Sequence, residues 1–298
     1  MSCSKPNYFL DLGVKENGKR NLKMIPQRAD YNFYVLCERY GKRNILVVPC
    51  GKCENCKKDY KRQWALRCEC EAKSHDINCF VTLTFDNNHV VDEVSKADLK
   101  KFIKDLRNHS IKVRYFGCGE YGHHPVTGDR NRPHYHIILF GYFPKDCKPI
   151  AKSKTGFWMY KSRFIESLWQ KGLCVVQDFD SQCASYVAGY VDKKIEDEAF
   201  ICMSTKPGIG YEFYRRNLDH LADTGEYIAK GGFKSKLPRY FEKVADSAFY
   251  DLSVLKEKRI LMSEQITLAQ CQEHGFLNVE ELYKWQGRSV KKGHARNL

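Results

Sequence analysis

Two periods of hydrophobic and polar residues alternate along the first two hundred positions of the chain. The segment 79–85, CFVTLTF, is β-branched and aromatic and predicts a strand. Residues 95–108 begin with a serine and place four apolar side chains on one stripe at helical spacing, which predicts a helix. By the same reasoning, strands are predicted at 43–50, 113–122, 132–141 and 173–177, and helices at 54–73, 164–170 and 181–195.

The order of these elements indicates the fold class. Between residues 79 and 195 the predicted order is strand, helix, strand, strand, helix, strand, helix, and the adjacent strands are joined by a loop of the hairpin kind. This order favours an α+β fold with a mainly antiparallel central sheet flanked by helices. We expect a basic, cysteine-containing region at 1–76, a core at 77–212, and a mostly helical C-terminal region at 213–298 with a loose basic tail.

Two histidines are placed on alternate positions of the predicted strand 132–141, RPHYHIILFG. Side chains of a strand point to opposite faces in turn, so His134 and His136 share one face and Tyr135 takes the other. An isolated histidine in a core usually only finds a hydrogen-bond partner. Two imidazoles side by side are also able to hold a metal ion, so other residues must decide between these readings.

A carboxylate on the preceding strand completes a candidate metal site. An antiparallel partner strand places Glu120 opposite the histidine pair. Two imidazoles and one carboxylate form a three-ligand site with open positions, which suits a catalytic divalent metal. Asp178 and Asp180 compete with Glu120 as the third ligand. His123 and His124 are adjacent in a loop, and we expect them to be exposed or to contact DNA rather than to form the catalytic pair.

Two tyrosines occur four residues apart in the predicted helix 181–195, within YVAGYVDKK. Tyr186 and Tyr190 therefore lie one turn apart on one helical face, and Lys193 and Lys194 follow three and four residues later. Tyrosines at this spacing are often an aromatic stripe on a core helix. Beside a metal site they are also candidate nucleophiles.

These motifs together resemble the HUH endonucleases that start rolling-circle replication. The family marker of histidine, hydrophobic residue, histidine matches His134 to His136, and its two-tyrosine helix matches Tyr186 and Tyr190. A TLT-type strand upstream matches residues 82–84. Within the family, the chain is most similar to replication initiators of gokushovirus-type phages of the Microviridae in four segments: PCGKCENCKKDYKRQWALR, GEYG, RPHYHIILFG and KPGIG.

The resemblance covers roughly residues 49–210 and implies a specific chemistry. It implies an HUH/RRM-like sheet and a Mg²⁺- or Mn²⁺-dependent enzyme that nicks single-stranded DNA at the phage origin. Tyr186 and Tyr190 would form 5′-phosphotyrosine links, Lys193 would stabilise the developing charge, and the ends could be rejoined. The free 3′-OH would prime a host polymerase, with a host helicase, in the bacterial cytoplasm. A conjugative relaxase or transposase is the first alternative, although relaxases tend to have a third histidine and an N-terminal tyrosine.

The charge of the chain agrees with a nucleic-acid partner. A formal net charge of +14 favours an anionic partner. The sequence contains no P-loop, so we expect no nucleotide hydrolysis, and it contains no apolar run of the roughly 20 residues that a membrane helix needs. The basic run in helix 54–73 either holds DNA phosphates or is a solvated helix face. The candidate DNA-binding residues are Lys57, Lys58, Lys61, Arg62, Arg67 and Arg132.

Fourteen cysteines raise a second possibility. The start of the chain lacks an apolar secretory segment, so we expect an intracellular protein whose thiols stay reduced. Cys50, Cys53 and Cys56 are each separated by two residues, and with Cys68 they are a candidate structural Zn²⁺ site. The alternative is a set of reduced thiols at a helix start. A basic, zinc-containing nucleic-acid-binding protein without enzymatic activity is therefore the second alternative function.

Overall fold

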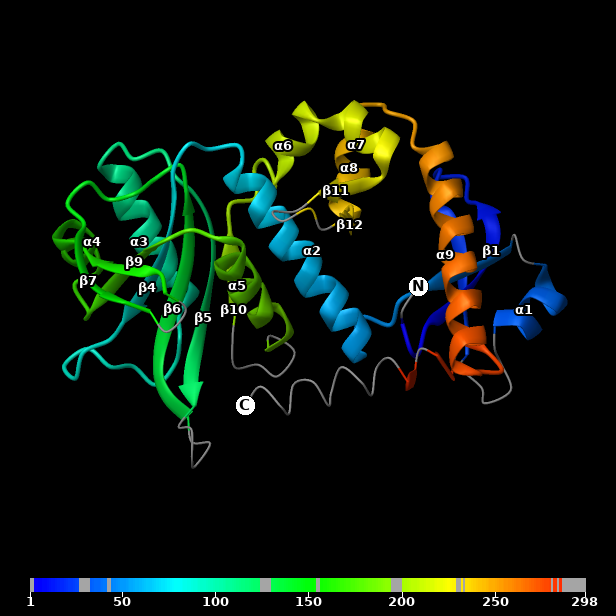
Figure 1. Ribbon diagram of the computed structural model, residues 1–298, viewed down its shortest axis with the longest axis horizontal. Coiled ribbons are helices and arrows are strands. Elements are labelled where there is room, and N and C mark those ends of the chain that lie inside the picture. Colours follow the sequence, from blue (N-terminus) through cyan, green and yellow to red (C-terminus); the bar gives the residue numbers. More distant parts are fainter. Residues whose placement is uncertain are drawn as a thin grey trace. The chain divides into compact units, whose positions relative to one another are not determined.

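The computed structural model describes the chain as two compact units (Figure 1). One unit comprises Met1–Asp59 and Glu257–Leu298, and the other comprises Tyr60–Lys256. The predicted division at residues 76 and 212 stays a prediction. The described residues are 3–26, 33–41, 44–123, 130–153, 156–193, 200–228, 232, 234–279, 281–282 and 284–285.

A sheet of seven strands, counted over the described residues, forms the centre of the larger unit. All of its strand pairings are antiparallel. Together with the flanking helices, this confirms the predicted α+β fold with an antiparallel sheet. In spatial order the strands are β10 (Phe200–Met203), β5 (Arg114–His123), β6 (Arg130–Phe140), β4 (Asn78–Thr84), β9 (Cys174–Asp178), β8 (Trp158–Lys161) and β7 (Lys148–Lys152).

Helices cover both faces of this sheet (Figure 1). On one face, α3 (Lys96–Asn108) and α4 (Arg163–Trp169) pack on the odd-numbered residues of β4 and β6. On the other face, α2 (Glu54–Ala72) and α5 (Ser181–Lys193) pack on the even-numbered residues. Burial on both faces explains why β4 and β6 are nearly continuous apolar runs.

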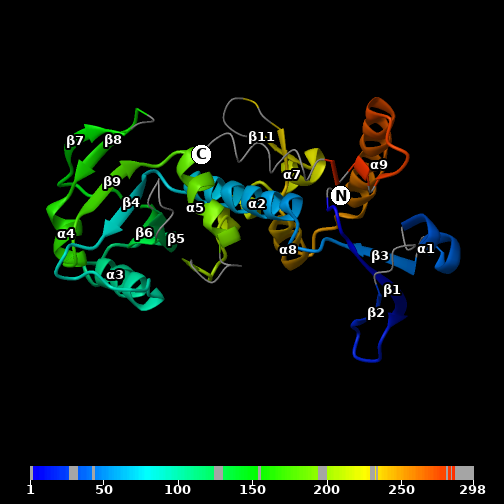
Figure 2. The same ribbon diagram turned by 90° about the horizontal axis from the view of Figure 1, so that it is seen from below.

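The hairpin of β7 and β8 was not predicted from the sequence. It lies at one edge of the sheet (Figure 2). Every described residue of β7 is exposed, so the strand carries no alternation of apolar and polar positions. An edge strand of this kind leaves no pattern that period-two reasoning detects.

The C-terminal third is mostly helical, as predicted. Helices α6 (Tyr211–Arg216), α7 (Leu218–Thr224) and α8 (Arg239–Ser247) and the hairpin of β11 (Glu226–Ile228) and β12 (Lys234–Lys236) pack with α2 around a third apolar cluster. The last long helix is α9 (Ser253–His274). Throughout the described part of the chain, each helix is too short or too polar to span a membrane.

The smaller unit contains a sheet of three strands, within the residues described, in the order β2-β1-β3. Its apolar core is small: the buried members are Tyr8, Ile25, Leu36 and Ile45. The elements are β1 (Asn7–Val14), β2 (Arg20–Ile25), α1 (Phe33–Tyr40) and β3 (Ile45–Val48).

Candidate active site

Strand register brings the predicted histidines and carboxylate together. Glu120 of β5 lies directly opposite His134 of β6, and His136 lies opposite Thr82 of β4. Period-two alternation then puts Glu120, His134 and His136 on the face that α2 and α5 cover. The intervening Tyr135 points to the other face, where it is fully buried and its hydroxyl accepts a hydrogen bond from the Ser95 amide.

The three side chains converge on one point. The distances from Glu120 Oε1 are 3.0 Å to His134 Nε2 and 2.9 Å to His136 Nε2. Neighbouring ligands of an octahedral ion at about 2.1 Å are about 3.0 Å apart, so this spacing matches a divalent metal site. Glu120 and His136 are buried, while the His134 side chain is 20 % exposed, which leaves one open side for a substrate. The donor set, two imidazoles and one carboxylate, fits Mg²⁺ or Mn²⁺.

The other nitrogens of the two rings have partners that fix the ring orientation. His134 Nδ1 lies 3.1 Å from the Arg132 carbonyl oxygen, to which it donates. His136 Nδ1 lies 3.0 Å from the hydroxyl of Thr82, and Phe80 stacks on the same ring with centroids 5.4 Å apart. This arrangement directs the Nε2 lone pairs inward, as metal-binding histidines require. The role of Thr82 in orienting His136 was not predicted, because it depends on pairing between distant strands.

Burial lowers the pKa of His136, although the neighbouring Glu120 carboxylate acts in the opposite direction. Removing the imidazolium from water costs more than Glu120 returns. His136 is therefore held in the neutral form, which is the form that binds a metal.

The hydroxyl of Tyr186 lies at the same point. It donates a hydrogen bond of 3.3 Å to Glu120 Oε1 and lies 3.4 Å from His136 Nε2. The Tyr186 side chain is 46 % exposed, whereas Ala184 and Val187 of the same helix are fully buried. Tyr186 is therefore not part of an apolar stripe in the core. The side chains of Tyr190 and Lys193 lie outside the residues that the structure describes, as do His124 and Lys194 and the side chain of His123.

The competing aspartates are placed elsewhere. Asp178 pairs with Cys79, at the end of β4 opposite to Thr84. Asp180 accepts a hydrogen bond of 2.8 Å from the Cys183 amide and so caps the start of α5. Glu120 is therefore the carboxylate that the structure brings to the histidine pair.

Two of the predicted DNA-binding arginines contact other parts of the protein. The Arg67 guanidinium lies between the rings of Trp64 and Tyr240, 4.0 and 3.8 Å from their centroids, and its Nε donates to the Ile209 carbonyl. In place of a DNA contact, Arg67 thus joins α2 to α8. Arg62 donates to Ser235 Oγ and to the Lys236 carbonyl of β12. Their role in packing was not predictable, because the covering segments are distant in the sequence.

The remaining basic residues differ in their position. A methyl group built at Gly189 would lie 3.2 Å from Lys61 Nζ, so the Lys61 ammonium lies against the turn of α5 that follows Tyr186. Arg132 is exposed, lies two residues before His134 on the same face, and donates to the Phe85 carbonyl and to Asn87. Lys57 and Lys58 belong to the part of α2 in the smaller unit, where Lys58 is exposed and Lys57 half-buried.

Cys68 does not join the other three predicted zinc ligands. It is fully buried among apolar side chains of α2, α5 and the sheet, and burial raises the pKa of its thiol well above the ordinary value. Its prediction as the fourth ligand is therefore wrong. The cysteine that lies beside Cys50, Cys53 and Cys56 is Cys3.

The glycine-rich segment 204–210 serves packing. Its carbonyls accept hydrogen bonds at Pro207 from Arg114 Nη2 and at Ile209 from Arg67, and the Gly210 amide donates 2.6 Å to Glu71 Oε2. Burial opposes ionisation of Glu71, but hydrogen bonds from His75, Arg114 and Gly210 outweigh burial and lower the pKa of Glu71. These bonds fasten the segment to α2 and β5 and do not direct its amides toward a phosphate.

Known proteins share this region. The family model of the replication-associated protein ORF2 matches residues 78–195, which run from β4 to the end of α5. The replication-associated protein ORF2 of Spiroplasma virus 4 is 30 % identical over 289 residues, which cover 87 % of this chain and 86 % of that protein. The chain belongs to this family of replication-associated proteins. The matched segment contains Glu120, His134, His136 and Tyr186.

Other phage members of the family extend the comparison. The replication-associated protein VP4 of Bdellovibrio phage phiMH2K is 29 % identical over 214 residues, 66 % of each chain. The replication-associated protein ORF4 of Chlamydia phage 1 is 26 % identical over 294 residues, covering 85 % of this chain and 72 % of that protein. The resemblance to replication proteins of small phages is thus confirmed. No solved structure matches the chain.

Proposed function

We propose that this family member initiates rolling-circle replication of a phage genome by metal-dependent nicking and rejoining of single-stranded DNA. One observation carries the chemical part of the proposal. The Tyr186 hydroxyl lies within 3.4 Å of both Glu120 Oε1 and His136 Nε2, the inward-facing atoms of the candidate metal site. A nucleophile and a phosphate-activating ion need to be adjacent in this way.

The three ligands would hold Mg²⁺ or Mn²⁺, which would polarise the scissile phosphate and offset the charge that develops on it. Tyr186 has to lose its hydroxyl proton, since tyrosine has an ordinary pKa of about 10, and the nearest acceptors are Glu120 Oε1 and His136 Nε2. The phenolate oxygen then bonds to phosphorus as the bond from phosphorus to the 3′ oxygen breaks. The products are a 5′-phosphotyrosine and a 3′-OH.

The same link explains how ends are rejoined. Attack of a 3′-OH on the phosphotyrosine reverses the first step and releases the tyrosine. Tyr190 lies four residues later on α5, so we assign it as the second nucleophile, with Lys193 near the developing charge. A host polymerase would extend the free 3′-OH and a host helicase would open the duplex, so the reaction would take place in the bacterial cytoplasm.

The basic surface would hold the single strand at this site. The net charge of +14 supports an electrostatic contribution to binding. We assign phosphate contacts to Arg132 and Lys61, which lie beside His134 and α5, and to Lys57 and Lys58. Arg62 and Arg67 are not assigned to DNA, because their guanidinium groups bond within the protein.

A denaturing gel tests this function directly. A labelled origin oligonucleotide is incubated with protein and Mg²⁺ or Mn²⁺, and a label that migrates with the protein reports the phosphotyrosine link. Tyr186→Phe should reduce the first adduct, and Tyr186→Phe with Tyr190→Phe should abolish it. The matched control is Tyr60→Phe, because Tyr60 is 49 % exposed and lies on α2. An adduct that survives in the double variant, or that forms in excess chelator, would refute the proposal.

A further inference from the structure

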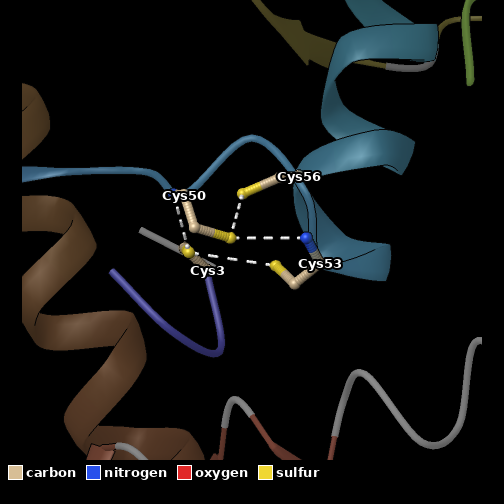
Figure 3. Close-up of side chains that lie close together, drawn as sticks. All are labelled: Cys3, Cys50, Cys53 and Cys56. Carbon is tan, nitrogen blue, oxygen red and sulfur yellow. Dashed lines mark hydrogen bonds between the residues drawn. The ribbon is translucent and has the colours of Figure 1, made fainter. Parts of the chain in front are cut away.

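Four cysteines of the smaller unit bring their sulfurs together (Figure 3). Cys50 Sγ lies 4.0 Å from Cys56 Sγ, and Cys53 Sγ lies 3.8 Å from Cys3 Sγ. All four sulfurs lie within 4.8 Å of one another, and all four thiols are free. Sulfurs that bind one zinc ion tetrahedrally, at about 2.3 Å each, are about 3.8 Å apart. The observed spacing therefore matches a four-sulfur metal site and is far longer than a disulfide.

The strand register of the small sheet brings these distant residues together. β1 and β3 are antiparallel, and Asn7 at the start of β1 pairs with Val48 at the end of β3. Cys3 precedes this pair on one strand and Cys50 follows it on the other, so both leave the sheet at the same end. Cys53 and Cys56 follow at the start of α2. Three chain segments thus meet at the cluster, and only one of them carries the repeated cysteine spacing.

Backbone amides point at the sulfurs. The amides of Lys52 and Cys53 donate to Cys50 Sγ at 3.4 and 3.3 Å, and the Cys50 amide donates to Cys3 Sγ at 3.3 Å. Gly51 makes the tight turn possible with a φ of +72°, a conformation that favours glycine. Hydrogen bonds donated to sulfur stabilise the thiolate, which is the form that binds a metal.

We propose that Cys3, Cys50, Cys53 and Cys56 bind one structural Zn²⁺ ion that fixes the N-terminal segment and the start of α2 to the small sheet. Four thiolates fill a tetrahedral site and leave no open position, which is the arrangement of structural rather than catalytic zinc. Each thiol releases its proton to solvent as the ion binds. Soft thiolates select zinc, whereas the imidazoles and carboxylate around His134 also suit Mg²⁺ and Mn²⁺.

The size of the local core explains why an ion is needed. Among the described residues, the apolar cluster beneath this sheet has four buried members. A core of this size contributes little stability, and small folds commonly add a metal ion or disulfides. An ion that joins Cys3 to Cys50 closes a long loop and restricts the unfolded chain. The ion would also set the first turn of α2, the helix that continues into the larger unit.

Elemental analysis of the full chain, purified under reducing conditions and dialysed against a weak chelator, tests the site. We expect one zinc per chain in the wild type. Cys3→Ser and Cys53→Ser should lose the ion, while Cys37→Ser, which changes a half-buried thiol of the same unit, should retain it. The double variant His134→Ala with His136→Ala should also retain the zinc. This arm separates the zinc proposal from the proposed nicking activity, which the same variant should lose.

Cobalt substitution of the wild type gives a second measurement that does not depend on the folding of a variant. Co²⁺ bound by four thiolates should give intense visible d–d bands and a sulfur-to-cobalt charge-transfer band. A zinc-free wild type with all thiols reduced would overturn the proposal. So would zinc that disappears with the two histidines, or a cobalt spectrum of octahedral oxygen and nitrogen ligation.

Discussion

Replacing Thr82 by valine tests how the strands orient the metal site. The Thr82 hydroxyl lies 3.0 Å from His136 Nδ1, and it is the hydrogen-bond partner that fixes the orientation of that ring. Valine has the same shape and keeps the strand preference of threonine, so the sheet should be unchanged. The substitution removes only the hydrogen bond and leaves the Nδ1 of a buried imidazole without this partner.

The expected magnitude follows from the burial of His136, which is 7 % exposed. Leaving a buried polar group without its partner costs about 1–3 kcal/mol. Because metal binding requires the tautomer that Thr82 orients, this cost should weaken metal binding, and losses of outer hydrogen bonds at metal sites are about 10- to 100-fold. The metal concentration that gives half-maximal nicking by Thr82→Val should rise by that factor. Activity at saturating metal should fall much less.

A matched control is available on the same strand. Thr84 lies two residues further along β4, on the same face and opposite His134, but its hydroxyl donates to the Leu173 carbonyl. Thr84→Val should therefore leave the metal dependence of nicking close to that of the wild type. Equal metal dependence in Thr82→Val, Thr84→Val and the wild type would refute the reasoning, and so would an equal rise in both variants.

Other expected outcomes concern the site, the charge and the fold. Glu120→Gln should abolish nicking but leave oligonucleotide affinity within a few-fold in a binding titration, since the site acts at one bond. Four phosphate contacts on single-stranded DNA predict a roughly 50-fold loss of affinity between 50 and 200 mM salt; an affinity that ignores salt would contradict the assigned contacts. Gly119→Val should lower the unfolding free energy by about 1–3 kcal/mol in chemical denaturation, because a Cβ there would lie 2.6 Å from the Phe200 ring. Glu71 has a folded-state pKa below its ordinary value of 4.5, so its contribution to stability is present above pH 4.5 and is lost as the pH falls below it. Glu71→Gln should therefore flatten the acid limb of a plot of stability against pH, and an unchanged limb would contradict this assignment.

The catalytic face was predictable because its rules are local. The alternation of side chains in β6 puts His134 and His136 on one face, and a hairpin-like connection puts Glu120 opposite them. The long apolar runs of β4 and β6 also made the central sheet predictable. The β7–β8 hairpin was missed, because an exposed edge strand carries no such pattern.

The errors share another cause, which is the packing of segments that are distant in the sequence. Cys3 joins the cysteine cluster through the pairing of β1 with β3, and no spacing in the sequence marks it. Cys68 follows the other cysteines closely, but α2 turns it into the core. Arg67 belongs to a basic run, yet Tyr240 covers it. Charge and spacing predict which residues are candidates, and only the covering segments decide between solvent, DNA and the core.

The division of the site between strands and a helix bears on how two tyrosines would share one metal ion. Glu120, His134 and His136 are held on paired strands by continuous backbone hydrogen bonds, so their geometry is rigid. Tyr186 instead belongs to α5, which contacts the sheet through the small residues Ala184 and Ala188. Small side chains leave a smooth surface, along which a shift of the helix meets little steric resistance. A fixed metal site and a nucleophile on a helix with such a contact are the arrangement that alternating use of Tyr186 and Tyr190 requires.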